Sequence, residues 1–275
     1  MIIAVASGKG GTGKTTVAVN MALSLSNIQL IDCDVEAPNS NLFLNLKLEK
    51  IGDVSIKIPV VDEEKCTHCG ECSRLCQYNA LAVLPDNVMV FKELCHGCGL
   101  CKIACPKGAI TEGDRVIGVI EKGGDGIEFL HGVLNIGEAM STPLIKKLKD
   151  NINKEKTVIL DVPPGTACPV IEAISNTDYC LLVTEPTPFG LYDLKIAVEL
   201  CRSMGVEFGV IINQDGIGNS DTNDFCIREE IPILLRIPYD RRIAELYSEG
   251  IPFVREMPEW RDKFRGLYKK IMNEE

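Results

Sequence analysis

A glycine-rich segment near the amino terminus constrains the fold of this chain more than any other feature. It fits the pattern G-x-x-x-x-G-K-[ST] in full. An apolar run at residues 2–6 precedes it and predicts a buried strand, and a helix is expected to follow over roughly 14–26. Glycines let backbone N–H groups turn inward, and the first turn of a helix carries a partial positive charge. This strand, loop and helix together predict a cradle for phosphate groups.

Two side chains of the loop have specific expected roles. Lys14 is expected to contact the β- and γ-phosphates of a nucleotide, and the Thr15 hydroxyl is expected to bind Mg²⁺. The alternative is a glycine-rich turn that matches by accident, and the flanking strand and helix argue against it. The expected nucleotide-binding positions of the loop are Gly8, Gly10, Gly11, Thr12, Gly13, Lys14, Thr15 and Thr16.

The rest of the chain alternates strand and helix patterns, which predicts an α/β fold with a mostly parallel sheet and helices on both faces. The expected strands are 28–31, 157–161, 179–183, 206–212 and 233–237. The expected helices are 142–151, 169–176, 188–204, 221–230 and 239–249. Residues 115–121 and 127–134, on either side of a glycine-rich turn, are expected to form a hairpin.

Cysteines interrupt this alternation between about 60 and 112, where an internal repeat occurs. Cys66 and Cys76 recur as Cys95 and Cys105, each 29 positions later (95 − 66 and 105 − 76). In a reducing cytoplasm, such cysteines indicate metal binding rather than disulfides. The sequence therefore predicts a small α+β module at 60–112, inserted into a larger domain formed by 1–59 and 113–275.

Each cysteine run has the spacing C-x₂-C-x₂-C-x₃-C and resembles the runs of bacterial ferredoxins with two [4Fe–4S] clusters. The resemblance implies that the fourth cysteine of each run binds the cluster of the other run. Zinc is the rival metal, although zinc ribbons do not require this spacing twice. Gln77 departs from the family pattern, which usually has proline there, and His68 and His96 are not assigned as ligands. The implied ligands are Cys66, Cys69, Cys72 and Cys105 for cluster 1, and Cys95, Cys98, Cys101 and Cys76 for cluster 2.

Lys9 adds a second lysine to the glycine loop. The segment KGGTGKTT at 9–16 resembles the deviant Walker A motif of the MinD/ParA class of ATPases. The resemblance implies a homodimer with ATP sandwiched between subunits, in which Lys9 reaches the partner's nucleotide in the manner of an arginine finger. The alternative is a lysine that only contacts solvent.

Other segments match the same class. Asp32 and Asp34 resemble switch I, in which Asp34 would orient the attacking water and Asp32 would lie near the Mg²⁺ shell. Asp161 begins D-x-P-P-G, which resembles switch II, and would hold Mg²⁺ directly or through water. Gly165 could donate its N–H group to a γ-phosphate, and Asn213 matches the position that reads adenine. The whole chain resembles MinD-superfamily ATPases that contain a ferredoxin domain.

Cys168 and the C-terminal segment each have two interpretations. Cys168 follows Asp161 by seven positions, as does a cysteine of the nitrogenase iron protein that holds a cluster shared between subunits. It is either such a ligand or an ordinary cysteine at a helix N-terminus, which we favour. Residues 259–272 predict an amphipathic helix with apolar positions on one side. We favour docking of this helix on the core over contact with a membrane surface.

Charge and composition exclude some functions. The formal net charge of −10 argues against nonspecific binding to nucleic acid. No apolar run approaches the length of a membrane span, and the amino terminus lacks a signal peptide, which predicts a cytoplasmic protein. The first hypothesis is a Mg²⁺-dependent ATPase that gates electron transfer to an unknown redox partner. The second is an iron–sulfur carrier of the Mrp type that serves an apo-protein, and the third is a MinD-like spatial regulator.

Overall fold

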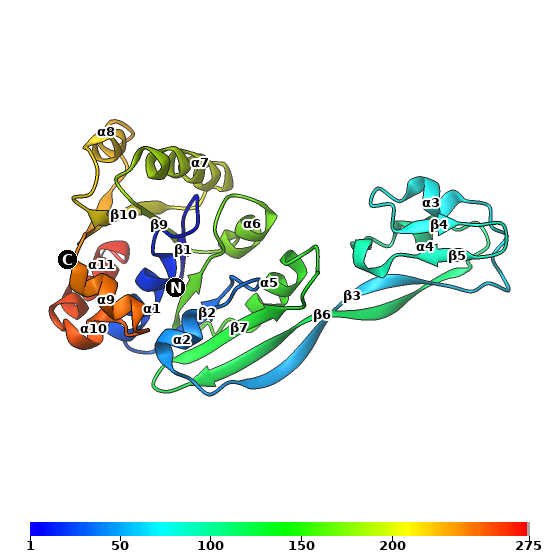
Figure 1. Ribbon diagram of the computed structural model, residues 1–275, viewed down its shortest axis with the longest axis horizontal. Coiled ribbons are helices and arrows are strands. Elements are labelled where there is room, and N and C mark those ends of the chain that lie inside the picture. The colour runs from blue at the N-terminus through cyan, green and yellow to red at the C-terminus, as the bar shows by residue number, and fades with distance from the viewer. Residues whose placement is uncertain (274–275) are drawn as a thin grey trace. The chain divides into compact units, whose positions relative to one another are not determined.

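The computed structural model describes residues 1–273, and its main feature is a nine-stranded sheet (Figure 1). Seven neighbouring strands of this sheet pair in parallel. In sheet order they are β11 (Ile233–Pro238), β10 (Phe208–Asp215), β9 (Tyr179–Thr184), β1 (Ile2–Ala6), β8 (Thr157–Asp161), β2 (Ile28–Asp32) and β7 (Glu128–Leu134), followed by β6 (Ile110–Gly124) and β3 (Glu49–Val61). The α/β fold with a mostly parallel sheet is confirmed.

The expected strands all occur, with shifts at their ends. The expected hairpin consists of β6 and β7, and β6 is longer than predicted because it continues alongside β3. Lys57 pairs with Asp114, and the Thr111 hydroxyl donates to the Val60 carbonyl, so β3 and β6 run antiparallel. The pattern of β3 alternates between exposed and buried positions and lacks the continuous apolar run that identified the parallel strands.

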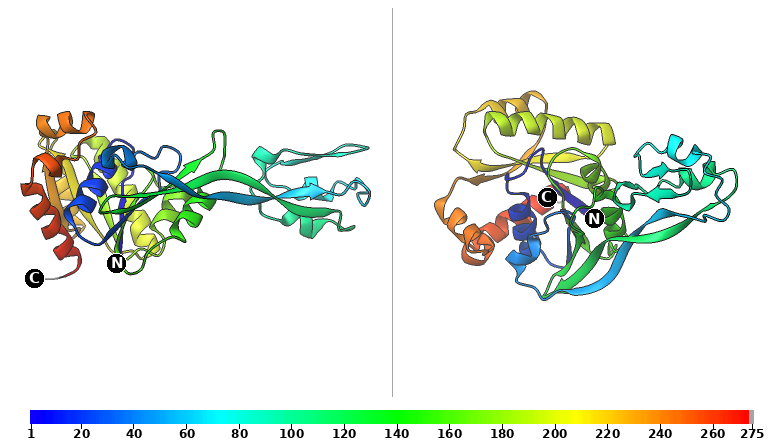
Figure 2. Two further views of the ribbon diagram at one scale, coloured as in Figure 1. Left: turned by 90° about the horizontal axis from the view of Figure 1, so that it is seen from below. Right: turned by 45° about the vertical axis from the view of Figure 1, so that its right-hand side comes forward.

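Helices cover both faces of the parallel strands (Figure 2). On one face, α1 (Lys14–Ser24), α10 (Phe253–Glu256) and α11 (Glu259–Ile271) pack with alternate residues of the strands, such as Val5 and Leu181. The other face is covered by α5 (Thr142–Lys149), α6 (Cys168–Ile174) and α7 (Pro188–Met204). The remaining helices of this part are α2 (Ser40–Leu44), α8 (Asp221–Arg228) and α9 (Arg241–Ser248).

Local signals explain why α7 matches its predicted bounds. The Thr187 hydroxyl accepts a hydrogen bond from the Gly190 N–H at 3.0 Å, and Pro188 begins the helix. Gly205 ends it with φ of 65°, a conformation that glycine adopts without strain. By contrast, the helix expected at 239–249 begins later, because the Asp240 side chain caps it at the Arg242 N–H.

The C-terminal helix α11 is docked on the core, as favoured from the sequence. Trp260 and Phe264 are buried, and Trp260 packs edge-on against Phe253 of α10. The Tyr268 hydroxyl shares a hydrogen bond of 2.8 Å with Thr157 at the start of β8. The apolar stripe is therefore covered by the protein itself. Among residues 1–273, no helix is long and apolar enough to cross a membrane.

A half-buried lysine connects α5 with the end of α6. Lys149 Nζ donates to the carbonyl oxygens of Glu172 and Ser175 at 2.6 Å and of Ala173 at 3.1 Å. The last carbonyls of a helix have no partner within the helix, so Lys149 satisfies groups that would otherwise lose their hydrogen bonds.

Replacing Lys149 by methionine is expected to lower the free energy of unfolding by about 2–3 kcal/mol, because several part-buried carbonyls lose a charged donor. Urea unfolding measures this change. The matched control is Lys147→Met on the same helix, because Lys147 forms only an exposed ion pair with Asp150. This substitution should change the free energy of unfolding by less than about 0.5 kcal/mol. Equal effects of the two substitutions would contradict the assigned role of Lys149.

The chain divides into two compact units. The first comprises 1–51, 120–133 and 145–275, and the second comprises 52–119 and 134–144. The second unit contains short elements: α3 (Glu71–Leu75), β4 (Leu81–Val83), β5 (Val88–Val90), a 3₁₀ turn at Lys92–Leu94 and α4 (Leu100–Ala104). It includes the repeated cysteine region and extends beyond 60–112 along β3 and β6.

Candidate functional site

The glycine loop connects β1 to α1 at the edge where the parallel strands have their carboxyl ends. At two positions of the loop, neighbouring atoms lie so close that only glycine fits. A Cβ atom at Gly8 would lie 2.3 Å from the Asp193 carbonyl oxygen, and one at Gly13 would lie 2.3 Å from Asn213 Nδ2. Gly13 also has φ of 91°, which side chains rarely tolerate. The loop therefore passes tightly between these neighbours, with its backbone N–H groups available at the helix N-terminus.

The loop opens on a cleft beside these strand ends, with a volume of about 450 Å³. The glycine loop and the start of its helix line this cleft through Gly10, Gly11, Gly13, Lys14, Thr15 and Thr16. Pro238, Tyr239, Asp240 and Tyr247 also line it. Binding sites for small molecules occupy clefts of about 300–1,000 Å³, so this cleft has ample room for a nucleotide.

Lys14 is largely buried beneath the loop. Burial lowers the pKa of Lys14, while the carboxylates of Asp161 and Asp34 act to raise it. These carboxylates favour the charged ammonium form that a phosphate group would bind. The Lys14 ammonium lies 3.5 Å from the Lys9 carbonyl oxygen, inside the curve of the loop.

Asp32 and Asp161 end the neighbouring strands β2 and β8 and are paired in register. Both are buried, and burial together with the Asp32 carboxylate raises the pKa of Asp161 to about 8. Asp161 Oδ2 accepts a hydrogen bond from the Ser40 hydroxyl at 3.0 Å, whereas Oδ1 has no partner. Two adjacent buried carboxylates and a free oxygen beside Thr15 are a donor set that suits Mg²⁺. The residues present therefore fit the predicted magnesium site.

Asp32 organises the segment that follows β2. Its carboxylate accepts backbone N–H bonds of 3.0 Å from Asp34, Asn39 and Ser40. Asp34 lines the cleft, and burial raises its pKa to about 6. Asp32 thus holds the loop that carries Asp34, and its own oxygens are already engaged by the backbone.

Ser40 links the two acids, and sequence reasoning missed it. Its N–H donates to Asp32 and its hydroxyl to Asp161, so it orients the carboxylate expected to hold Mg²⁺. The only sequence signal is a serine at the start of a short helix after the Asp32-x-Asp34 motif.

The Ser40→Ala substitution is expected to weaken Mg²⁺ binding about tenfold, the usual cost of removing a group that orients a metal ligand. The measurement is the Mg²⁺ dependence of nucleotide binding. Ser24→Ala is the matched control, because Ser24 is also buried and its hydroxyl donates to the Asn20 carbonyl of its own helix, away from the two acids. An unchanged Mg²⁺ requirement in Ser40→Ala would contradict this role.

Other predicted residues have partners within the chain. Lys9 Nζ lies 2.6 Å from Glu185 Oε1, a partner that the sequence did not indicate. The Gly165 N–H donates to the Ser7 carbonyl at 3.2 Å, so donation to a phosphate would require it to change partner. Asn213 lines the cleft, and its Nδ2 donates to the Thr12 carbonyl at 2.8 Å, which fixes the glycine loop.

The cysteine repeat of the second unit is also a repeat of structure. The helices α3 and α4 occupy corresponding positions, offset by 29 residues (100 − 71). Residues with positive φ recur at the same offset: His68 and Gly97, Gly70 and Gly99, and Asn79 and Gly108. These positions shape each cysteine loop in the same way, because the backbone must turn through the left-handed region at each of them.

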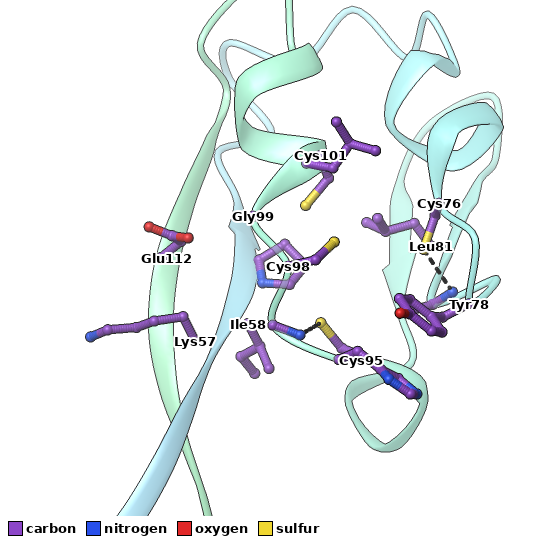
Figure 3. Close-up of a pocket in the computed structure, with 15 residues that line it drawn as sticks. Lys57, Ile58, Cys76, Tyr78, Leu81, Cys95, Cys98, Gly99, Cys101 and Glu112 are labelled. Carbon is purple, nitrogen blue, oxygen red and sulfur yellow. Dashed lines mark hydrogen bonds between the residues drawn. The ribbon is translucent and has the colours of Figure 1, made fainter. Parts of the chain in front are cut away.

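The thiols gather in two groups of four. Cys66, Cys69, Cys72 and Cys105 line one cavity, which we call cavity 1. Cys76, Cys95, Cys98 and Cys101 line another, cavity 2, and Figure 3 shows their sulfur atoms turned toward a common space. Each cavity takes three cysteines from one run and the fourth from the other. The grouping matches the two ligand sets implied by the ferredoxin resemblance.

Backbone N–H groups point at the sulfur atoms of both cavities. Cys66 accepts from the His68 N–H at 3.4 Å and Cys95 from the Gly97 N–H at 3.5 Å. Cys105 accepts from the Ala109 N–H at 3.2 Å, and the N–H groups of its loop lower the pKa of this thiol although partial burial opposes them. Four converging thiols with such donors suit the thiolate ligands of an iron–sulfur cluster.

The remaining cysteines lie apart from these groups. Cys33, Cys180, Cys201 and Cys226 are buried. Cys168 is exposed at the start of α6, and among the described residues it belongs to no cluster of metal-binding side chains. Its bridging role stays a hypothesis.

The glycine loop after β1, the acids that end β2 and β8 and the order of the parallel strands define a P-loop nucleotide-binding protein. Residues 3–253 match the family described as CobQ/CobB/MinD/ParA nucleotide binding domain, and the chain belongs to this family. The predicted resemblance to the MinD/ParA class is thereby confirmed. The inserted ferredoxin module stays a prediction.

Similar proteins cover nearly the whole chain. The uncharacterized protein MJ0579 of Methanocaldococcus jannaschii is 33% identical over 93% of this chain and 92% of its own length. An iron–sulfur cluster carrier protein of Pyrococcus abyssi is 24% identical over 92% of this chain and 78% of its own length. The septum site-determining protein MinD of Pyrococcus horikoshii, solved with Mg-ADP, has a TM-score of 0.57 and 20% identity, covering 98% of this chain and 95% of that one.

Proposed function

We propose that this chain is a Mg²⁺-dependent ATPase whose nucleotide-dependent homodimer controls electron transfer through two [4Fe–4S] clusters. One observation carries the proposal: the same chain has a P-loop nucleotide cleft and two separate cavities that each collect four thiols. A stable pair of four-thiol sites suits clusters that stay bound while electrons pass.

The residues of the cleft have distinct roles in this proposal. Lys14 and the loop N–H groups bind the phosphates, and Thr15 and Asp161 hold Mg²⁺, which neutralises phosphate charge. Asp34 orients the attacking water. Lys9 leaves Glu185 and reaches the nucleotide of the partner subunit, and the Gly165 N–H moves from Ser7 to the γ-phosphate. Both movements exchange one hydrogen-bond partner for another, which supports a two-state switch.

The cysteine unit would hold the clusters, and each bound cluster would accept or release one electron. Cys66, Cys69, Cys72 and Cys105 hold cluster 1, and Cys95, Cys98, Cys101 and Cys76 hold cluster 2. The chain's own contribution is to position the thiolates and to direct N–H donors at their sulfurs, which stabilises the more negative, reduced cluster.

A second candidate function is the assembly or delivery of clusters. The observation that favours it is the similarity to proteins named iron–sulfur cluster carriers, including that of Pyrococcus abyssi. The two functions differ in the fate of the cluster: an electron carrier keeps it, and a delivery protein gives it to an apo-protein.

One experiment separates the two functions. The clusters are reconstituted anaerobically in the full chain, and their reduction potentials are measured with and without MgATP. An ATP-dependent shift that is absent in Lys14→Ala supports electron transfer. Movement of the clusters to an apo-ferredoxin acceptor, with no such shift, supports delivery. A protein that takes up zinc but no iron would contradict both.

A further inference from the structure

Among the corresponding positions at which the linings of the two cavities differ, two pairs concern the stacking of rings. Tyr78 corresponds to Lys107 (107 − 78 = 29), and His96 corresponds to Thr67 (96 − 67 = 29). Tyr78 and His96 line cavity 2, whereas Lys107 and Thr67 line cavity 1. The backbone of the two halves is alike at these places, so the difference lies in the side chains.

In cavity 2, the two rings form a stacked pair. Their centroids are 3.6 Å apart and their planes differ by 7°. Tyr78 lies two residues after Cys76, and His96 directly follows Cys95, so the stack joins the segments that carry two of the four thiols. Figure 3 shows Tyr78 on the side of the cavity where Cys76 and Cys95 lie. The stack therefore covers this side of cavity 2 and holds together the segments that carry Cys76 and Cys95.

Among the described residues, no stacked pair of rings lines cavity 1. Neither Thr67 nor Lys107 has a ring, so these two side chains cannot stack; both are exposed, as Tyr78 itself is. His68 also lines cavity 1, and its ring pairs with Glu63 at 3.1 Å. Cys69 and Cys98 are both exposed, so this pair of thiols does not distinguish the cavities, whereas Cys72 is buried and the corresponding Cys101 is half-buried.

We propose that the Tyr78–His96 stack protects cluster 2 and that cluster 1 is the exchangeable cluster of the pair. This inference rests on the proposed function, because it requires that both cavities hold clusters. Loss of a cluster begins when water or a chelator reaches its iron. Water and chelator reach the iron more easily where no side-chain contact joins the two segments that carry the cysteines. In the delivery role, the same difference would make cluster 1 the one that leaves.

The test is the anaerobic release of iron from the reconstituted full chain to a ferrous chelator, with excess dithionite. Each iron exchanges its thiolate and sulfide ligands for the chelator, dithionite reduces the ferric ions, and the freed sulfurs take up protons from water. We expect two phases of equal amplitude, the fast one from cluster 1.

The repeat supplies matched variants. Tyr78→Lys introduces the residue that the other half has at this position, and it should accelerate only the slow phase by several-fold to about tenfold. Tyr78→Phe keeps the ring and should leave both phases unchanged. The reciprocal variant, Thr67→His with Lys107→Tyr, should slow the fast phase. Where Tyr78→Lys takes up no iron, His96→Thr tests the same stack from its other side.

The outcomes separate this inference from the proposed function. Release of all iron in one phase, or an unchanged slow phase in Tyr78→Lys and His96→Thr, would overturn the inference while leaving two clusters in place. A wild-type chain that binds no iron would overturn the proposed function itself.

Discussion

Replacing Lys9 by alanine is expected to lower the rate of ATP hydrolysis by about 10³-fold, because a cation supplied across a subunit interface contributes about 10³–10⁵ to such reactions. Nucleotide binding should be retained, since Lys14 and the loop are unchanged. The decisive measurement mixes this variant with Lys14→Ala subunits, which are inactive for a different reason.

The mixture distinguishes action across the interface from action within one subunit. In a mixed dimer, the Lys9→Ala subunit keeps an intact nucleotide site, and its partner supplies Lys9. An equal mixture should therefore recover up to about a quarter of the wild-type rate, because half of the dimers are mixed and each has one complete site. No recovery would show that Lys9 does not act across the interface.

Glu185 offers a further control for Lys9. Its carboxylate holds Lys9 at 2.6 Å and also accepts from the Thr187 hydroxyl at 3.0 Å. Glu185→Gln replaces the ion pair with Lys9 by a weaker, uncharged contact and leaves the lysine in place. ATP hydrolysis should therefore persist in this variant. A rate as low as that of Lys9→Ala would mean that Glu185 has a direct part in the reaction.

The second large expected effect concerns how the clusters share their ligands. Replacing both Cys66 and Cys105 by alanine should remove one cluster and leave about four irons per chain, because these two cysteines line the same cavity. Replacing Cys66 and Cys76 should remove both clusters, because they belong to different cavities. Iron and sulfide analysis of the purified chains measures the difference.

The reverse result would contradict the exchange of the fourth cysteine between runs. If each run held its own cluster, the Cys66 and Cys76 pair would leave about four irons and the Cys66 and Cys105 pair would leave none. Cys226→Ala controls for the loss of a buried thiol outside the two sets. Cys168→Ser should also leave the iron unchanged in the assembled dimer, and that result would remove the bridging role suggested for Cys168.

Features that depend on local sequence were predictable. The glycine loop, the bounds of α7 and the cysteine repeat each follow from residues that are close together in the chain. A proline, a cap or a glycine with positive φ acts within one turn, so its effect can be read without the rest of the fold. The grouping of thiols by cavity was anticipated only through the resemblance to ferredoxins.

Features that depend on distant residues were missed. Lys9 and Glu185 are 176 positions apart, and Ser40 and Asp161 are 121 positions apart. Neither partner carries a signal of its own, because glutamate and serine are common and their roles come from the order of the strands. The Tyr78–His96 stack was missed for a related reason: the repeat was recognised from its cysteines, and the stack lies at positions where the two halves differ.

The pairing of β3 with β6 has a consequence for how such a chain can arise. The Asp62 N–H donates to the Ala109 carbonyl at 2.7 Å, so the intervening segment leaves and returns at a single backbone hydrogen bond. A short turn could close the same ladder, since two antiparallel strands need only a hairpin to join them. The cysteine-rich segment can therefore be inserted or removed as one piece, without a change in the order of the strands that carry the nucleotide cleft.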